Sequence, residues 1–288
     1  MKLYPIQCGK FKLDGGAMFG VVPKTLWEKT NPADARNLIE LGTRSLLVED
    51  GKKLILIDCG LGDKQDEKFF GHYSLWGDDS LDKNLRKFGF VRDDITDVFL
   101  THLHFDHCGG AVEWNDDRSG YRPAFKNAHF WTNENHWQWA TEPNPREKAS
   151  FLKENILPIQ ESGQLNFLPL PTTGNYGFAP DLKMDVIFVD GHTEKQMLPV
   201  LQYQEKTIVF AADLIPTAGH IPQVYVMGYD TRPMLTMEEK GKFLKQCVDN
   251  DYLLFFEHDA HNELASLKMT ERGVKLDETF SFNEIFGY

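Results

Sequence analysis

The stretch THLHFDHCGG, residues 101–110, places four side chains that can bind metal ions within six consecutive positions. They are His102, His104, Asp106 and His107. Imidazole and carboxylate groups suit Zn²⁺, Mn²⁺, Fe²⁺ or Co²⁺ better than Ca²⁺ or Mg²⁺. We therefore interpret this stretch as part of a transition-metal site.

The spacing of the four residues predicts how they divide between ions. His102 and His104 lie on the same side of an extended chain, because alternate side chains of a strand share a face, so they can chelate one ion. Asp106 and His107 follow in a turn or helix start, where two glycines loosen the backbone, and they can reach a second ion. The pattern therefore indicates two neighbouring metal sites.

Further potential ligands follow other apolar, strand-like runs. The run VFLT leads to His102, and the runs VIFVDG, IVFAA and LLFFE each lead to another candidate. These runs lack strict alternation, which is typical of strands that are buried on a core face. We expect the remaining ligands to be His192, Asp213 and His258.

Several secondary elements can be predicted around these motifs. SLLVED and LILIDCG, joined by a glycine-containing turn, predict a hairpin over residues 45–60. A short amphipathic helix is expected over residues 81–88, with Asp78 or Asp79 as its N-cap. Another helix is expected around residues 148–159, and one near Thr236, where Glu239 would complete a capping box.

The domain organisation is predicted to be simple. With 288 residues, of which 41% are hydrophobic, we expect one domain over residues 1–288. Residues 111–183 are rich in Pro and Gly, and we expect them to form an insertion over the active site.

Composition excludes several classes of partner. The formal net charge of −12 and the lack of a basic tract argue against nucleic acid, because phosphate binding requires clustered positive charge. No apolar run is long enough to span a membrane and no signal-peptide pattern begins the chain, so we expect a cytoplasmic protein with no membrane partner. The four cysteines are widely spaced and form no CxxC pair, which fits a reducing compartment.

Taken together, these motifs resemble those of the metallo-β-lactamase-fold hydrolase superfamily. The resemblance covers THLHFDHCGG, GHT at 191–193, AAD at 211–213 and EHD at 257–259, and Asp58 with Gly60 matches the family's Asp-x-Gly. It implies an α/β chain folded as a four-layered αββα sandwich. It also implies a dinuclear centre holding two divalent transition-metal ions, with Zn²⁺ preferred and Mn²⁺, Fe²⁺ or Co²⁺ as alternatives.

The same resemblance implies a role for each candidate ligand. One ion would be held by His102, His104 and His192, and the other by Asp106, His107 and His258. Asp213 would bridge both ions, and Asp58 would orient ligands by hydrogen bonding. A hydroxide between the ions would attack a small-molecule substrate, and Asp106 would pass the proton to the leaving group. Whether the chain forms a homodimer stays open.

Within the superfamily, the lactonase-like and methyl-parathion-hydrolase-like branch is the most similar, and ADLIPTAGH at 212–220 resembles the latter. Two departures qualify this. GHTEKQML replaces the usual GHTPGH, and Pro216 stands where lactonases of this family carry a tyrosine. His220 or Tyr225 could then protonate the leaving group, and a lactone or a carboxylic or phosphoric ester is the expected substrate.

Four apolar residues are candidates for a substrate pocket. Relatives of this branch place a substrate-facing loop where DGGAMFGVVPKTLW stands, which suggests Met18, Phe19 and Trp27, while Trp114 closely follows the histidine motif. Packing within the core is an equally good interpretation of these residues.

Two other functions are alternatives to a hydrolase. The first is a mononuclear non-haem iron enzyme of the same fold, similar to a persulfide dioxygenase, in which His107 and His258 would be idle. The second is a non-enzymatic metal-binding or scaffold protein, which the complete ligand set disfavours. For the histidines outside the motifs we expect structural or surface roles: His72, His129, His136 and His261.

Overall fold

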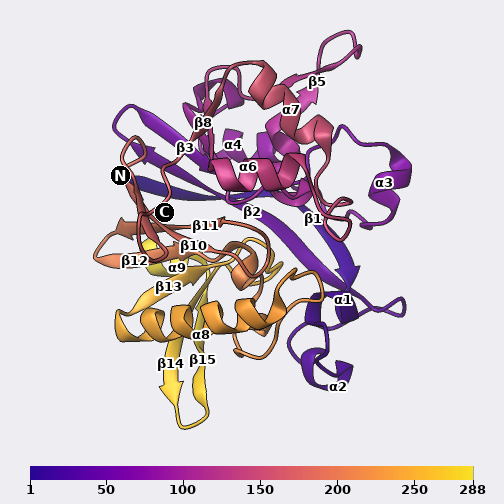
Figure 1. The fold of residues 1–288 in the computed structure, drawn as a ribbon. Coiled ribbons are helices and arrows are strands. Elements are labelled where there is room, and N and C mark those ends of the chain that lie inside the picture. The colour runs from indigo at the N-terminus through magenta and orange to yellow at the C-terminus, as the bar shows by residue number, and fades with distance from the viewer. Residues whose placement is uncertain (288) are drawn as a thin grey trace. The chain divides into compact units, whose positions relative to one another are not determined.

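The computed structural model in Figure 1 describes residues 1–287. The chain forms two compact units, which are described separately. The first comprises Met1–Lys10 and Thr43–Lys183, and the second comprises Phe11–Gly42 and the residues from Met184 onward. Two long strands, β1 (Lys2–Asp14) and β2 (Leu38–Asp50), carry the chain from one unit to the other.

The strands β1 and β2 begin a six-stranded sheet with the order β1-β2-β3-β4-β7-β8. Its other strands are β3 (Lys53–Ile57), β4 (Asp97–Phe99), β7 (His129–Thr132) and β8 (Leu165–Phe167). The predicted hairpin is confirmed, since β2 and β3 pair antiparallel from Leu46↔Ile57 to Asp50↔Lys53. From β3 to β8 all pairings are parallel, so these strands end at the same edge of the sheet.

Among the described residues, the first unit contains five α-helices, and all but the first bury side chains in the core on this sheet. They are α3 (Glu67–Gly71), α4 (Leu81–Lys87), α5 (Phe105–Cys108), α6 (Glu134–Thr141) and α7 (Lys153–Glu161). Leu56, Val98 and Phe130 of the strands share one buried cluster with Leu85 of α4 and Ile159 of α7. The helix after residue 80 was predicted correctly, but its N-cap is Ser80, whose side chain accepts from the backbone N–H of Lys83.

The segment 111–183 does not behave as a simple insertion. Its strands β7 and β8 are part of the sheet, and its helices α6 and α7 contribute buried residues to the same core. It also contains the small hairpin of β5 (Val112–Trp114) and β6 (Tyr121–Pro123), and the strand β9 (Tyr176–Ala179). These strands were not predicted from the sequence, because a strand of three or four residues is too short to show an alternation of apolar and polar side chains.

The second unit has its own sheet, in which six strands run in the order β15-β14-β13-β12-β11-β10. Their bounds are β10 (Met184–Val189), β11 (Gln196–Tyr203), β12 (Lys206–Phe210), β13 (Tyr252–Phe255), β14 (Leu264–Thr270) and β15 (Gly273–Phe280). β12 and β13 are parallel, and β11 is antiparallel to both β10 and β12. The chain therefore leaves β10, β12 and β13 at the same edge.

The helices of this unit are α1 (Gly15–Phe19), α2 (Lys24–Trp27), α8 (Pro233–Asp249) and α9 (Phe282–Phe286). The predicted capping box of Thr236 with Glu239 is wrong, because α8 begins earlier, with Pro233 in its first turn. Glu239 instead accepts from the backbone N–H groups of Asp190 and Gly191, each at 2.9 Å. It thus fixes the loop that follows β10.

No helix within residues 1–287 combines the length and apolar character that crossing a membrane would require. All four cysteines are free thiols, and three of them are buried.

Candidate functional site

The first unit gathers metal-capable side chains where its parallel strands end. Asp58 directly follows β3, and His102 lies three residues beyond the end of β4. Asp106 and His107 lie on α5, which confirms the predicted helix start. Parallel strands place these chain segments beside one another, so positions distant in sequence meet at one edge.

His102 and His104 turn ring nitrogens toward each other, with His102 Nε2 3.1 Å from His104 Nδ1. The opposite nitrogen of His102, Nδ1, lies 3.1 Å from the hydroxyl of Thr101. Both imidazoles are buried. Such paired nitrogens suit chelation of one transition-metal ion, as the alternation of side chains along an extended segment predicts.

Asp58 is fully buried and holds the motif in place, as expected for an orienting carboxylate. Its oxygens accept from the backbone N–H of Thr101 at 2.8 Å and from the Thr101 hydroxyl at 2.6 Å. Asp58 Oδ2 also lies 3.1 Å from Nδ1 of His107. Nε2 of His107 therefore points away from Asp58, 3.9 Å from Oδ1 of Asp106.

The two glycines after the motif do not loosen the backbone, as the sequence suggested, but permit close packing. A Cβ on Gly109 would lie 2.0 Å from the carbonyl oxygen of Leu61, and one on Gly110 would lie 2.1 Å from that of Cys59. The buried ammonium of Lys64 also donates to the carbonyl of Gly109. The loop after β3 therefore packs closely against the C-terminal end of α5 and restricts its position.

The second unit gathers its own donors at the edge where β10, β12 and β13 end. His192, Asp213 and His258 follow these three strands within three residues. Asp213 lies between the histidines, with Oδ2 3.1 Å from Nε2 of His192 and Oδ1 3.1 Å from Nε2 of His258. One carboxylate thus presents each of its oxygens to a different imidazole.

Backbone geometry at this position is strained. Ala212, immediately before Asp213, has a φ of 40°, a left-handed conformation that is uncommon for residues other than glycine. Such strain persists only where the surrounding structure enforces it, and it is common at functional sites.

The distal nitrogens of both histidines are held by protein groups. Nδ1 of His258 lies 2.8 Å from the carbonyl oxygen of Gly42, and Nδ1 of His192 lies 2.8 Å from Oδ1 of Asp230. Burial lowers the pKa of His192, but the carboxylates of Asp213 and Asp230 outweigh it and raise the pKa to about 10. The two carboxylates therefore stabilise a positive charge at His192, and a divalent cation bound to the neutral imidazole could supply that charge instead of the proton.

Asp230 was not identified from the sequence. It is buried and lies 38 residues after His192, without a motif to mark it. Only the path of the chain before α8 brings it to the imidazole.

Replacing Asp230 tests its orienting role. We expect Asp230→Ala to weaken metal binding by about 10–100-fold, because the imidazole of His192 loses the partner that fixes its orientation. Competition with a chromogenic chelator measures this change. Asp277→Ala, an exposed carboxylate on β15 paired with Lys268 in the same unit, is the control and should keep the wild-type affinity.

His220 lies within the core of the second unit. Its Nδ1 is 2.8 Å from the hydroxyl of Thr217, its Nε2 is 2.9 Å from the carbonyl oxygen of Met18, and its ring stacks on Phe19 at 4.1 Å. Burial, followed by the positive charge of Lys240, lowers the pKa of His220 to about 3. This environment suits a neutral packing residue, and the proton-donor role predicted for it has no support in these contacts.

The pH dependence of stability follows from this pKa. An unfolded histidine takes up a proton near pH 6.5, whereas the folded His220 resists protonation down to about pH 3. The unfolded state therefore binds more protons throughout this window, so stability falls as the pH drops from 6.5 to 3. We expect His220→Gln to show a shallower decline of unfolding free energy with falling pH, as measured by denaturant titration; equal slopes would contradict the assignment.

The predicted pocket residues are placed as follows. Met18, Phe19 and Trp27 are almost completely buried, and the rings of Phe19 and Trp27 stack at 5.2 Å. Trp114 is half-buried, packs against Tyr121 at 4.3 Å, and donates its indole N–H to the carbonyl of Lys64. The first three thus lie in the core of the second unit, and Trp114 lies on the β5–β6 hairpin.

The histidines outside the motifs have structural or surface positions, as predicted. His72, His129 and His261 are exposed. His136 is buried, and its Nε2 accepts from the backbone N–H of Leu103, between the two histidines of the first pair, at 2.8 Å.

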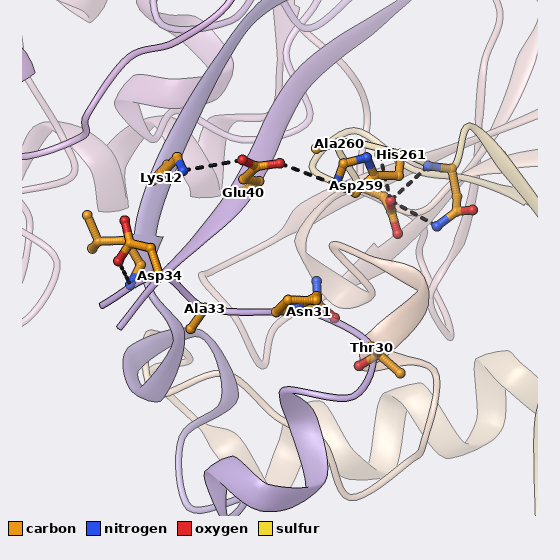
Figure 2. A pocket seen from close by; sticks show the side chains of 12 residues that line it. Lys12, Thr30, Asn31, Ala33, Asp34, Glu40, Asp259, Ala260 and His261 are labelled. Carbon is orange, nitrogen blue, oxygen red and sulfur yellow. Dashed lines mark hydrogen bonds and ion pairs between the residues drawn. The ribbon is translucent and has the colours of Figure 1, made fainter. Parts of the chain in front are cut away.

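A pocket of about 280 Å³ lies in the second unit, between the strands that carry Lys12 and Glu40 and the loop that follows His258 (Figure 2). Glu40 is 3.3 Å from Lys12 and 3.5 Å from His261. Asp259 accepts from the backbone N–H of His261 and of the residue after it. Both carboxylates thus form ion pairs or hydrogen bonds with other groups of the protein, as is common in a polar surface hollow.

Comparison with known proteins assigns the chain to a family. The sequence profile described as Metallo-beta-lactamase superfamily matches residues 38–258. The curated N-acyl homoserine lactonase AiiA of Bacillus thuringiensis subsp. kurstaki is 23% identical over 275 residues, which cover 91% of this chain and 94% of that protein.

Solved structures give the same result for the fold. A probable metal-dependent hydrolase from Staphylococcus aureus is 27% identical, with a TM-score of 0.85, over 97% of this chain and 96% of that one. AidC, described as a dizinc quorum-quenching lactonase, is 23% identical, with a TM-score of 0.76, over 97% and 95% of the two chains. The predicted fold is thereby confirmed.

Proposed function

Because this chain belongs to the metallo-β-lactamase superfamily and is a metal-dependent hydrolase, we propose that it acts through a dinuclear centre on a lactone or ester. The substrate would be a small, fairly apolar molecule with a lactone, carboxylic ester or phosphoric ester bond. The observation that carries the proposal is Asp213, whose two oxygens each lie 3.1 Å from a different imidazole nitrogen. A carboxylate in this arrangement can bridge two ions.

The candidate ligand atoms, histidine nitrogens and carboxylate oxygens, are of the kinds that bind transition-metal ions. Four histidines each form a hydrogen bond to a protein group through Nδ1, and their Nε2 atoms face other candidate metal ligands. This is the arrangement that orients metal-binding imidazoles in proteins. These are His102 with Thr101, His107 with Asp58, His192 with Asp230, and His258 with Gly42. His104 differs, since its Nδ1 faces His102.

In the proposal, the candidate ligands divide between two ions as the family resemblance implies. His102, His104 and His192 would hold one ion, and Asp106, His107 and His258 would hold the other, with Asp213 between them. Bound there, two divalent ions would lower the pKa of a shared water toward neutrality and polarise the oxygen of the scissile bond. Zn²⁺ is the first choice, because imidazole and carboxylate ligands suit it.

The protein's own residues supply proton transfer. The side chain of Asp106 is 12% exposed, at the start of a short helix, and its Oδ1 faces Nε2 of His107. A carboxylate in this position can take a proton from the attacking water and deliver it to the leaving group. Pro216 has no proton to give and the imidazole of His220 is engaged in the core, so we assign this step to Asp106, with Tyr225 as the alternative donor.

The choice of substrate is supported by relatives. AiiA and AidC are both described as lactonases, and this chain matches each over nine tenths of its length or more. Neutral lactones and esters are also compatible with a chain of net charge −12, which would repel polyanions.

The first test is metal content followed by hydrolysis. Protein purified without added metal is analysed for ions per chain and then assayed with lactones, aryl esters and a phosphotriester. We expect two divalent ions and turnover of at least one of these classes. One iron per chain, with oxygen consumption and no hydrolysis, would replace the proposal with the mononuclear iron enzyme.

A further inference from the structure

We propose that Glu147, which belongs to none of the metal motifs, is a positioning residue that holds Nε2–H of His104 so that Nδ1 binds the metal. The inference rests on the proposed metal centre but concerns a residue of this chain to which no role has been given. It explains how two histidines only two positions apart can use different ring nitrogens.

The geometry around His104 leads to this assignment. Glu147 Oε1 lies 3.4 Å from His104 Nε2, within ion-pair distance but without the alignment of a hydrogen bond in this structure, and both side chains are buried. On the other side of the ring, Nδ1 of His104 lies 3.1 Å from Nε2 of His102, where a shared ion would bind. Phe151 packs against the imidazole at 4.7 Å, so the ring is held at its face as well.

The second oxygen of Glu147 fixes the direction of the carboxylate. Oε2 accepts from the indole N–H of Trp139 at 2.6 Å and from the amide of Asn144 at 2.5 Å. With both donors on Oε2, Oε1 must face His104. A carboxylate with only 3% of its residue surface exposed requires such partners, because burying a charge without them is costly.

The backbone around Glu147 links it further to the metal motif. Ser150 donates its N–H to the carbonyl of Glu147, and its own carbonyl accepts from the N–H of Phe105, the residue after His104. The loop at residues 144–150 therefore holds both the backbone and the ring at this position. An oriented carboxylate behind a metal-binding imidazole fixes its tautomer and raises its basicity.

Glu147→Gln tests the assignment with little change of shape. To keep the two hydrogen bonds from Trp139 and Asn144, the new amide must place its oxygen at the position of Oε2 and its NH₂ toward His104. Nε2 must then accept, so the ring proton moves to Nδ1 and blocks the metal-binding nitrogen. We expect metal affinity to fall by about 10–100-fold and the absorption spectrum of the Co²⁺-loaded protein to change.

Glu113→Gln is the matched control. Glu113 is a partly exposed carboxylate of the first unit paired with Arg122, so the same chemical change there should leave the metal affinity and the Co²⁺ spectrum unchanged. Equal metal affinity in Glu147→Gln and the wild type, with unchanged Co²⁺ spectra, would overturn the proposal. A purely structural role would lower the melting temperature of the metal-free protein and leave the affinity unchanged.

A measurement on the wild type covers the case in which Glu147→Gln does not fold. Long-range ¹H–¹⁵N correlation spectra of the Zn²⁺-loaded wild type should show His104 with its proton on Nε2; a proton on Nδ1 would refute the inference. If the wild type binds no metal at all, the proposed function fails instead, and this outcome is seen before any variant is made.

Discussion

Replacing Asp213 by asparagine should abolish most of the activity and the binding of both ions. The change keeps the shape but removes the negative charge, and one of the two atoms facing His192 and His258 becomes an NH₂ group, which cannot bind a metal ion. The loss of kcat/KM should exceed the roughly 100-fold upper end for residues that only orient ligands. Metal analysis and hydrolysis rates on the same preparation measure both effects.

Asp251→Asn is the control for this change. Asp251 lies in the same unit, with its exposed carboxylate 2.8 Å from Lys206, and its replacement should leave rate and metal content unchanged. If Asp213→Asn kept two ions per chain and the wild-type rate, the bridging role would be wrong.

Replacing Gly109 by alanine should strongly destabilise the first unit. The new Cβ would lie 2.0 Å from the carbonyl oxygen of Leu61, a backbone atom that cannot move aside as a flexible side chain could. Overpacking typically costs 1–3 kcal/mol, and a backbone collision belongs at about the upper end. For a chain of this size that corresponds to a melting temperature lower by roughly 6–12 °C, measured by thermal unfolding of the metal-free protein.

Gly71→Ala provides the comparison. Gly71 is the last residue of α3, and a Cβ there would meet no atom within 4 Å, so this variant should melt at or slightly above the wild-type temperature. A similar melting temperature for both variants would show that the loop after β3 moves to accommodate the new methyl group. Its packing against α5 would then contribute little to stability.

The position of the metal donors could be predicted from the sequence because it depends on local pattern. Apolar runs ending in His102, His192, Asp213 or His258 are visible one at a time, and the structure places each residue within three positions of a strand end. The spacing of THLHFDHCGG likewise determines an extended pair followed by a helical turn, since side-chain direction follows the local periodicity.

Other features could not be predicted, because they depend on which distant segments meet. Asp230 reaches His192 across 38 residues, Glu147 reaches His104 across an irregular loop, and Glu239 holds the loop after β10 instead of capping its own helix. The strands β7 and β8 were missed for a related reason, as three or four residues show no period of their own and become strands only by pairing with neighbours.

The sequence by itself thus determined the metal-binding residue types and the strand ends that carry them, since both are written in short stretches of chain. Only the tertiary structure decided which carboxylates orient those ligands and which residues are merely packed. His220 shows the difference: its position in the sequence suggested a proton donor, but Thr217, Met18 and Phe19 surround it on three sides. The hydrogen bonds and burial that set the role of such a side chain come from residues far away in the chain, and folding alone brings them together.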